Sequence, residues 1–350
     1  MFTESFTLLA KLSQSVGTLP QYVQGGGGNT SVKINDELMA VKASGYKLKQ
    51  ITENEGFVVV NYKKIKEYYN NVDLSSDLDY EKDSTRFTRE NIVKFEGLKE
   101  LRPSVEAGFH SILKKYVIHT HPVYANIVCC STEGESLMHK IFSGEERNVL
   151  WIPYINPGFF LTIKIKEELD KYNEKSEYPE IIFMENHGLI VHSDNLEDCI
   201  KLHEEVNMRI KDYFNIREEY PKIEILQIFD GVLRSNTEYL VNYFKNKKIE
   251  NDFFEKYSLY PDQLVYLNDS ISMDENVKNK LVINTEKGEL TYYTNYNEAL
   301  TIEETLLGYI YVIDNIQKLG LKVRSMSEEG INFIRNWESE KYRKNLAKQI

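Results

Sequence analysis

The stretch YVIHTHPVYANI, residues 116–127, is a mainly apolar run that predicts a buried strand, yet it contains His119 and His121. Side chains at positions i and i+2 of a strand project from the same face, about 6.6 Å apart, so both imidazoles can reach one cation. Taken alone, the pair is more typical of two histidines satisfied within a core. Whether the two histidines form a metal site or a structural pair depends on other residues of the sequence.

A third histidine follows a second predicted strand. The stretch EIIFMENHGLIVHS, residues 180–193, turns at Asn186, His187 and Gly188, so the turn offers the His187 imidazole. Three neutral imidazoles with an open fourth position are typical of a catalytic zinc site. His192 is a rival third ligand, but it lies within the following strand, where we expect a structural role.

A glutamate precedes the histidine pair. The segment RPSVEAGFHSILKK begins a predicted helix, with Pro103 and Ser104 as start signals and Glu106 in the first turn. A glutamate at this position usually stabilises the helix, because its negative charge interacts favourably with the helix dipole. Beside a metal, however, a carboxylate whose pKa is raised by partial burial can exchange a proton with carbon. His110, one helical turn on, would support Glu106 from the same face.

Two glycine-containing turns are candidates for anion binding. The first, QGGGGNTSVK, precedes a strand and is therefore neither a dinucleotide-binding motif nor a P-loop. Its backbone N–H groups can point at one anion, with the Asn29 amide and the Thr30 or Ser31 hydroxyl as further donors, although a flexible turn is the alternative. The second, VKASGYKL, places Ser44 and Gly45 at a strand end. Two such turns and a metal predict a small phosphorylated substrate.

The whole-chain composition narrows the class of protein. A length of 350 residues predicts about two domains, and a net charge of -11 without a long basic block makes nucleic acid an unexpected partner. The N-terminal stretch MFTESFTLLAKLSQ has no basic region and no long apolar core, so we expect neither secretion nor a membrane span. Three cysteines, Cys129, Cys130 and Cys199, predict buried thiols in a reducing cytoplasm.

The chain divides near residue 220. Before it, strand-like and helix-like segments alternate, as in a layered α/β domain; strands are expected at 31–34, 37–43, 57–62, 116–121, 149–154, 180–185 and 188–192, and helices at 135–142, 162–173 and 196–214. An acidic stretch, residues 70–85, predicts an exposed loop. After residue 220 we expect a helix at 237–248, two strands within 280–294, two C-terminal helices and no chemical motif.

Five motifs in this order resemble the class II aldolase/adducin family: GGGGNTSVK, VKASGYKL, RPSVEAGFH, HTHP and ENHGLIV, over about residues 5–215. The resemblance implies a three-layer α/β/α sandwich with a mixed, mainly antiparallel sheet, followed by a smaller α+β C-terminal region. It also implies a homotetramer. IPYINPGF resembles the aldolase half of longer rhamnulose-1-phosphate aldolases fused to a short-chain dehydrogenase, and we expect no dehydrogenase here. YPDQLVYL and NWESEKYR resemble the extension of such long forms.

The resemblance assigns roles to particular residues. Three match the zinc ligands of the family: His119, His121 and His187. Glu106 matches the catalytic acid/base. Four match positions that hold the substrate phosphate: Asn29, Ser44, Gly45 and Ser104. Val105 departs from the pattern, because phosphate-using members often have a second serine there, and it offers no side-chain donor.

These roles predict zinc-dependent, reversible aldol cleavage of a ketose 1-phosphate, of the rhamnulose or fuculose type, by residues 1–220. Residues 221–350 have no assigned role, and a tyrosine from a neighbouring subunit would assist. Alternatives stay open: a 4-epimerase, which tends to have aspartate in place of Glu106, a sugar-acid decarboxylase, a non-catalytic adducin-like scaffold, or a protein whose C-terminal region acts as an assembly module.

Overall fold

The first 220 residues form a mixed sheet of eight strands. The computed structural model describes residues 2–144, 148–172, 178–273 and 279–337. The strand order is β4-β3-β2-β1-β5-β8-β7-β6, and all neighbours are antiparallel except β6 and β7. The strands are β1 (Asn29–Lys33), β2 (Leu38–Lys42), β3 (Phe57–Asn61), β4 (Ile92–Val93), β5 (Tyr116–Thr120), β6 (Val149–Ile152), β7 (Ile181–Met184) and β8 (Gly188–Ser193).

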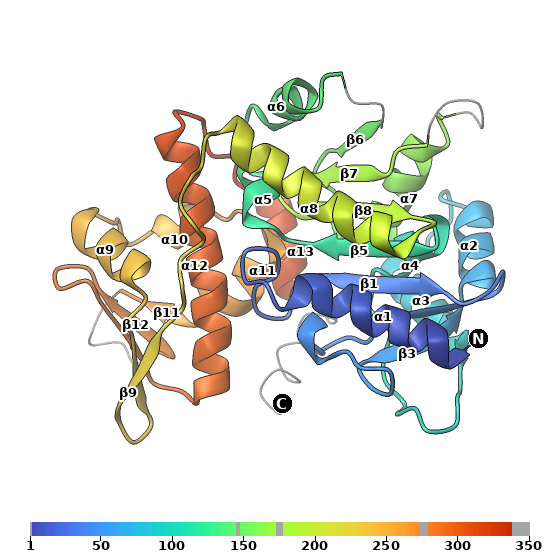
Figure 1. Cartoon of the computed structure of the whole chain (residues 1–350), viewed down its shortest axis with the longest axis horizontal. Coiled ribbons are helices and arrows are strands. Elements are labelled where there is room, and N and C mark those ends of the chain that lie inside the picture. The colour runs from blue at the N-terminus through green and yellow to red at the C-terminus, as the bar shows by residue number, and fades with distance from the viewer. Residues whose placement is uncertain (1, 145–147, 173–177, 274–278, 338–350) are drawn as a thin grey trace.

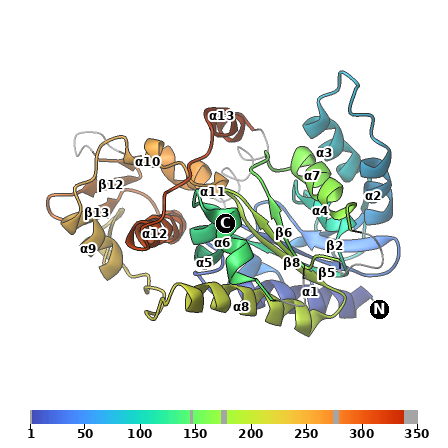
Figure 2. The ribbon, with the colours of Figure 1, turned by 90° about the horizontal axis from the view of Figure 1, so that it is seen from above.

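Helices cover both faces of this sheet (Figure 2). One face carries α1 (Phe2–Gly17), α5 (Val123–Cys129), α6 (Gly134–Ile141) and α8 (Leu196–Tyr213). The other carries α2 (Tyr62–Asn71), α3 (Tyr80–Glu90), α4 (Ala107–Ile112) and α7 (Phe159–Leu169). The short helix η1 (Leu48–Gln50) follows β2. The expected three-layer fold with a mixed, mainly antiparallel sheet is therefore confirmed.

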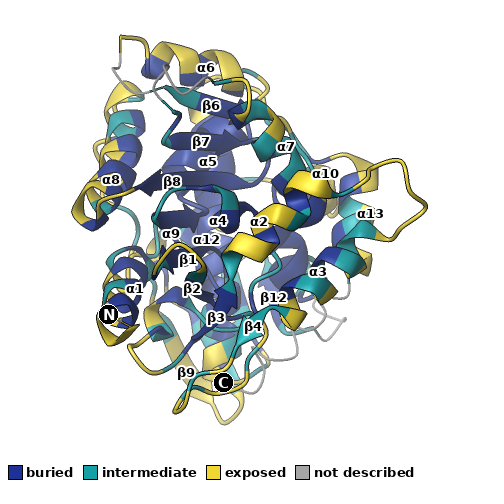
Figure 3. Cartoon of the chain, turned by 90° about the vertical axis from the view of Figure 1, so that its right-hand side faces the viewer, coloured by how far each residue is buried: buried dark blue, intermediate teal, exposed yellow. Residues whose placement is uncertain are grey.

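Burial explains why the central strands have such continuous apolar sequences. All residues of β5, β7 and β8 are buried, because helices cover both faces. Tyr116 and Ile118 pack toward α1 and α8, and Val117 packs toward α4 and α7. Figure 3 shows β7 and β8 as buried and the outer side of α2 as exposed. His119 has the parity of Val117, so it lies on the α4 side of the sheet.

The C-terminal region contains a second, smaller sheet of order β11-β12-β13-β10-β9. Its strands are β9 (Ile225–Phe229), β10 (Val232–Ser235), β11 (Ile271–Ser272), β12 (Leu281–Asn284) and β13 (Glu289–Tyr292). Its helices are α9 (Glu238–Asn246), α10 (Phe253–Lys256), α11 (Pro261–Gln263), the π-helical η2 (Leu264–Asn268), α12 (Tyr296–Lys318) and α13 (Glu328–Asn336). The predicted hairpin at 280–294 and the two final helices are confirmed, whereas α1 and the β9–β10 hairpin were not predicted.

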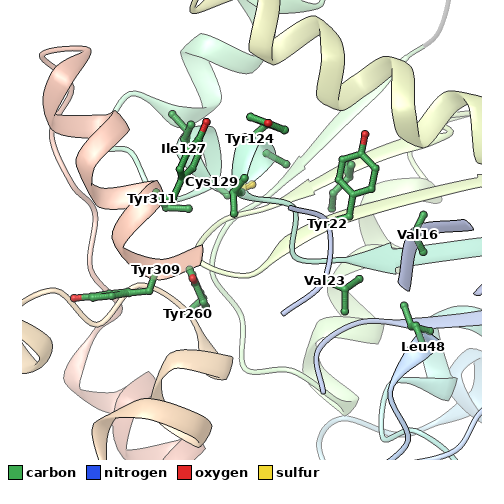
Figure 4. Packing of buried hydrophobic residues seen from close by; sticks show 14 of the residues in the cluster. Val16, Tyr22, Val23, Leu48, Tyr124, Ile127, Cys129, Tyr260, Tyr309 and Tyr311 are labelled. Atoms are coloured by element: carbon green, nitrogen blue, oxygen red, sulfur yellow. The ribbon is translucent and has the colours of Figure 1, made fainter. Parts of the chain in front are cut away.

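The long helix α12 joins the two regions, since it lies between the two sheets (Figure 1). Its residue Tyr311 packs against Tyr124 of α5, with ring centroids 6.1 Å apart (Figure 4). On its other side, the buried Glu303 accepts hydrogen bonds from Ser235 and Thr237. One hydrophobic core therefore runs through both regions, and the division at residue 220 stays a prediction.

The acidic stretch 70–85 was predicted to be an exposed loop, and this is wrong for its second half. Asp79 accepts a hydrogen bond from the Lys82 N–H at 3.2 Å and so caps α3, which begins at Tyr80. Within this stretch, only residues 72–79 lie outside a helix. Glu81, in the first turn of α3, accepts a hydrogen bond from the Phe159 N–H at 2.9 Å and ties α3 to α7.

Glu81 makes stability depend on pH. Burial raises its pKa from 4.5 to about 7, although N–H groups of Phe159 and Phe160 oppose the shift. Because the unfolded chain loses this proton first, Glu81 lowers the stability as pH rises through this window, by at most about 3 kcal/mol. In Glu81→Gln, which keeps an acceptor for Phe159, we expect this component to be absent. Urea unfolding of wild type and Glu81→Gln at about pH 4.5 and about pH 8 gives the change in the free energy of unfolding between the two pH values for each protein. The same change in both proteins would contradict the assignment.

None of the helices in the described ranges is long and apolar enough to cross a membrane. The predicted helix at 162–173 is observed as α7, with residue 173 outside the described residues, and only Asn336 and Trp337 of NWESEKYR are described.

Candidate metal centre

Three buried imidazoles meet at one end of the first sheet. His119 lies near the end of β5, His121 directly follows that strand, and His187 lies in the turn between β7 and β8. Each offers a ring nitrogen, and these atoms all lie within 4.8 Å of one another. β5 and β8 are antiparallel partners, so the end of β5 meets the turn that begins β8. The structure thus brings together the three histidines singled out in the sequence.

Gly188 allows this close approach. A Cβ atom at Gly188 would lie 2.4 Å from the Thr120 carbonyl oxygen and 2.9 Å from His121 Cδ2, so a larger residue would push the turn away from β5. Asn186 adopts a left-handed conformation with φ of 51°, which asparagine tolerates better than most residues. These two residues explain why the turn can carry His187 to the end of β5.

Hydrogen bonds at the Nδ1 atoms fix two of the rings. His119 Nδ1 lies 3.1 Å from the Leu189 carbonyl oxygen, and His121 Nδ1 lies 2.5 Å from Asp262 Oδ2. Both partners are acceptors, so each Nδ1 carries the proton and each Nε2 keeps a free lone pair. Burial, as the largest cause, lowers the pKa of His119 well below its usual range, so its imidazole is neutral.

The free lone pairs are suited to a cation. His119 Nε2 and His121 Nε2 are 3.2 Å apart, and two lone pairs at this distance repel each other unless a cation lies between them. Two nitrogens bound tetrahedrally to zinc at the usual bond length are separated by about 3.3 Å. The donor set of three imidazoles is also one that zinc favours. The residues present therefore fit a zinc ion.

Glu106 faces the same point. Its Oε2 atom lies 3.6 Å from His119 Nε2, and its Oε1 atom lies 3.3 Å from His187 Nε2. Burial by itself raises the pKa of Glu106, whereas the positive charges that His119, His187 and His121 carry when protonated, together with a hydrogen bond to His187, lower it to a net pKa well below its usual range. The expected upward shift was wrong. Glu106 is also the N-cap residue of α4, one position before the helix, where the sequence predicted the first turn.

A buried chain of hydrogen bonds orients Glu106. The Asn29 Nδ2 atom donates to Glu106 Oε2 at 2.6 Å and to Ser104 Oγ at 3.2 Å. The Asn29 Oδ1 atom accepts from His110 Nε2, and His110 Nδ1 accepts from Ser31 Oγ at 2.7 Å. Burial lowers the pKa of His110 to about 3, so this imidazole is neutral. His110 therefore supports Glu106 through Asn29 and not directly.

The remaining predicted residues lie beside these groups. Ser44 and Ser104 line a narrow cavity of about 30 Å³ together with Asn29, Glu106, His121 and His187. Gly45 turns the chain with φ of 90° and is not among the described residues that line this cavity. The phosphate-binding roles of these residues stay predictions. His192 lies opposite Val117 on β8, outside the three-histidine group.

Sequence reasoning missed Asp262. It lies 141 positions after His121, in a region where no chemical motif was expected. The only signal was that Asp262 belongs to the segment YPDQLVYL, which resembles a long-form extension. Pro261, Asp262 and Trp337 also line the narrow cavity, so the C-terminal region forms part of its wall.

A wider cleft continues from the narrow cavity. It has a volume of about 1120 Å³ and shares Ser44, Ser104, Val105 and Trp337 with the cavity. A ligand larger than a few atoms would therefore have to occupy both the cavity and the cleft.

The first part of the chain is similar to known proteins. Residues 7–213 match the family model of the Class II Aldolase and Adducin N-terminal domain. The uncharacterized oxidoreductase YuxG of Bacillus subtilis (strain 168) is 30% identical over 148 residues, which are 39% of this chain and 20% of that protein. The chain therefore spans about a fifth of the length of that curated relative.

Solved structures also match part of the chain. The N-terminal class II aldolase domain of a protein from Thermoplasma acidophilum is 23% identical, with a TM-score of 0.49, over 59% of this chain and 92% of that chain. The L-fuculose-1-phosphate aldolase from Thermus thermophilus is 12% identical, with a TM-score of 0.39, over 62% of this chain and 96% of that chain.

Proposed function

The chain belongs to the class II aldolase and adducin N-terminal domain family, and from that premise we propose that it catalyses reversible aldol cleavage of a ketose 1-phosphate. The products are dihydroxyacetone phosphate and an aldehyde. The observation that carries the proposal is the convergence of three buried imidazoles and the Glu106 carboxylate on one cavity. Such a site can hold a metal ion, and the carboxylate beside it can move a proton to or from a carbon of the substrate.

The reaction needs two proton transfers. The bond between C3 and C4 of the sugar breaks as the C4 hydroxyl loses its proton and becomes the aldehyde carbonyl. The electron pair of the broken bond stays on the C3 fragment, and Glu106, once protonated, gives its proton to C3. In the condensing direction, the Glu106 carboxylate takes the same proton away. The base that accepts the C4 hydroxyl proton is expected to be the deprotonated phenolate of a tyrosine from a neighbouring subunit, and in the condensing direction the neutral phenol gives this proton back to the aldehyde oxygen.

His119, His121 and His187 would hold the zinc ion through ring nitrogens. When bound, zinc supplies a Lewis acid that polarises the substrate carbonyl. Asn29 keeps the Glu106 carboxylate aimed at this point by donating to its Oε2 atom. Because the site is buried, these groups act in a region of low dielectric, where they stabilise charge more strongly than in water.

The substrate phosphate is proposed to lie where the narrow cavity meets the cleft. Ser44 and Ser104 line both spaces and can donate hydrogen bonds to it. Val105 also lines both and offers no donor, so fewer hydroxyls than in typical members would hold the phosphate. We therefore expect the phosphate to contribute less to binding than it does in relatives with a second serine.

The assay that tests the proposal is release of dihydroxyacetone phosphate from rhamnulose 1-phosphate and from fuculose 1-phosphate by zinc-loaded protein. Release from one of them by the wild type, and not by Glu106→Gln, is the expected result. Conversion into a stereoisomer without release would replace the aldolase with a 4-epimerase, and release of carbon dioxide from a sugar acid would indicate a decarboxylase. Inactivity on both sugar phosphates and on the sugar acid with zinc bound would favour a scaffold.

The support of Glu106 by His110 gives a separate prediction. In His110→Phe, Asn29 loses the donor that fixes its amide, so we expect turnover to fall by about 10-fold to 100-fold while bound zinc stays at one per chain. His192→Phe, which alters a buried imidazole outside the cavity, is the matched control. Equal losses of turnover in both variants would show that the effect comes from packing.

The setting of the enzyme is also proposed. The three cysteines are unpaired and buried, which supports a reducing cytoplasm. The family resemblance supports a homotetramer, in which a neighbouring subunit supplies the assisting tyrosine.

A further inference from the structure

We propose that Asp262 of the C-terminal region is a positioning residue of the metal centre. Its carboxylate holds His121 in the tautomer that carries the proton on Nδ1, so that Nε2 points at the metal with a free lone pair. The inference rests on the proposed function in taking the three imidazoles as metal ligands. Under this proposal, the region after residue 220 supplies a residue that positions a metal ligand.

The contact is short, buried and charged. Asp262 is 2% exposed, and its Oδ2 atom lies 2.5 Å from His121 Nδ1. A carboxylate that accepts the second N–H of a metal-binding histidine fixes the ring and raises the basicity of the coordinating nitrogen. His119 has only a neutral carbonyl oxygen at its Nδ1, and His187 Nδ1 has no hydrogen-bond partner in the described part of the chain. Asp262 therefore gives His121 the strongest support of the three rings.

The glycine loop, residues 25–28, leaves room for the contact between Asp262 and His121. A Cβ atom at Gly27 would lie 2.2 Å from Asp262 Oδ2 and 2.9 Å from His121 Nδ1, distances that real Cβ atoms do not reach. Any residue larger than glycine would thus separate the carboxylate from the imidazole. This gives one glycine of the QGGGGN segment a purpose that anion binding does not explain.

Asp262 is held in place by its own segment. Pro261 begins α11, and the neighbouring Gln263 accepts a hydrogen bond from the Leu259 N–H at 2.7 Å and donates to the Phe254 carbonyl oxygen at 2.9 Å. Both Asp262 and Gln263 are buried. The carboxylate is therefore presented from a rigid turn, as a positioning group requires.

The C-terminal region also holds the turn that carries His187. The Asn186 Nδ2 atom donates to the carbonyl oxygens of Leu259 and Arg324, each at 2.8 Å. Leu259 lies three residues before Asp262, so one short segment contacts the His121 ring and the residue next to His187.

The same region supports the glycine loop. The Gly25 N–H donates to Glu304 of α12 at 3.1 Å, and Glu304 also pairs with Lys47 at 3.4 Å. Without the C-terminal region both contacts would be lost, because Glu304 makes each of them. The C-terminal region therefore supports the metal centre through several contacts and not only through Asp262.

Zinc affinity measured by competition with a chromophoric chelator tests the proposal without any substrate. In Asp262→Ala we expect the zinc dissociation constant to rise by about 10-fold to 100-fold, and in Asp262→Asn, which keeps an acceptor without the charge, by a smaller factor. Asp314→Asn is the matched control, because Asp314 is a buried carboxylate of the same region that pairs with Lys247, away from the cavity. Its zinc affinity should equal that of the wild type.

A second readout separates positioning from folding. Nitrogen NMR shifts of the imidazoles in zinc-free protein report which ring nitrogen carries the proton, and we expect Asp262→Ala to change those of His121 while His119 keeps its tautomer. Zinc affinity of Asp262→Ala within twofold of the wild type would overturn the proposal, as would an equal loss in Asp314→Asn. An inactive aldol assay combined with the expected loss of affinity would overturn the proposed reaction alone.

Discussion

Replacing His119 with alanine is expected to reduce zinc affinity by more than about 100-fold, because it removes a metal ligand, and even groups that only support a ligand change affinity by 10-fold to 100-fold. His119 is fully buried and its Nε2 atom lies 3.2 Å from that of His121, so alanine would leave the metal with two of its three imidazole ligands. Equilibrium dialysis with zinc, followed by metal analysis, measures the loss.

His192→Ala is the matched control for this experiment. His192 is also a fully buried histidine, on the neighbouring strand β8, but it lies outside the three-histidine group. Its loss should cost stability through the cavity it leaves and should not change zinc binding. Retention of one tightly bound zinc in His119→Ala, or loss of zinc in His192→Ala, would contradict the assigned ligand set.

Changing Glu106 to glutamine is expected to reduce turnover by about 10²-fold to 10⁴-fold, the usual contribution of a general acid or base, while zinc stays bound. The amide has nearly the shape of the carboxylate and can still accept the hydrogen bond from Asn29 Nδ2. It cannot take up a proton from carbon. Steady-state kinetics and metal content of the same sample measure both quantities.

Glu180→Gln is a matched control, because Glu180 is a largely buried glutamate paired with Lys114, away from the cavity. It should keep full turnover. If Glu106→Gln lost zinc in proportion to its turnover, Glu106 would be a metal ligand and not the group that moves the proton, and the two roles would have to be reassigned.

Much of the first domain could be predicted because its signals are local. The strands that become β5, β7 and β8 are continuous apolar runs, as expected where helices cover both faces of a sheet. The pairing of His119 and His121 follows from the i and i+2 geometry of one strand, although β5 ends at Thr120 and His121 directly follows it. His187 could be added because its motif has the shape of a turn.

Other features depend on contacts between distant segments, which a single sequence does not reveal. Asp262 reaches His121 across 141 positions, and the Asn29 amide reaches Glu106 across 77. The acidic stretch was assigned to a loop from its composition, whereas Asp79 caps a helix within it. The pKa of Glu106 was expected to rise with burial, and the surrounding imidazoles reverse its direction.

The measurement that tests the central claim most directly is proton exchange at C3 of dihydroxyacetone phosphate in heavy water, followed by proton NMR, because it needs no knowledge of the aldehyde. Zinc-loaded wild type should replace one C3 hydrogen with deuterium, and Glu106→Gln and zinc-depleted protein should not. Exchange by Glu106→Gln at the wild-type rate, or no exchange by zinc-loaded wild type that binds dihydroxyacetone phosphate, would contradict the account.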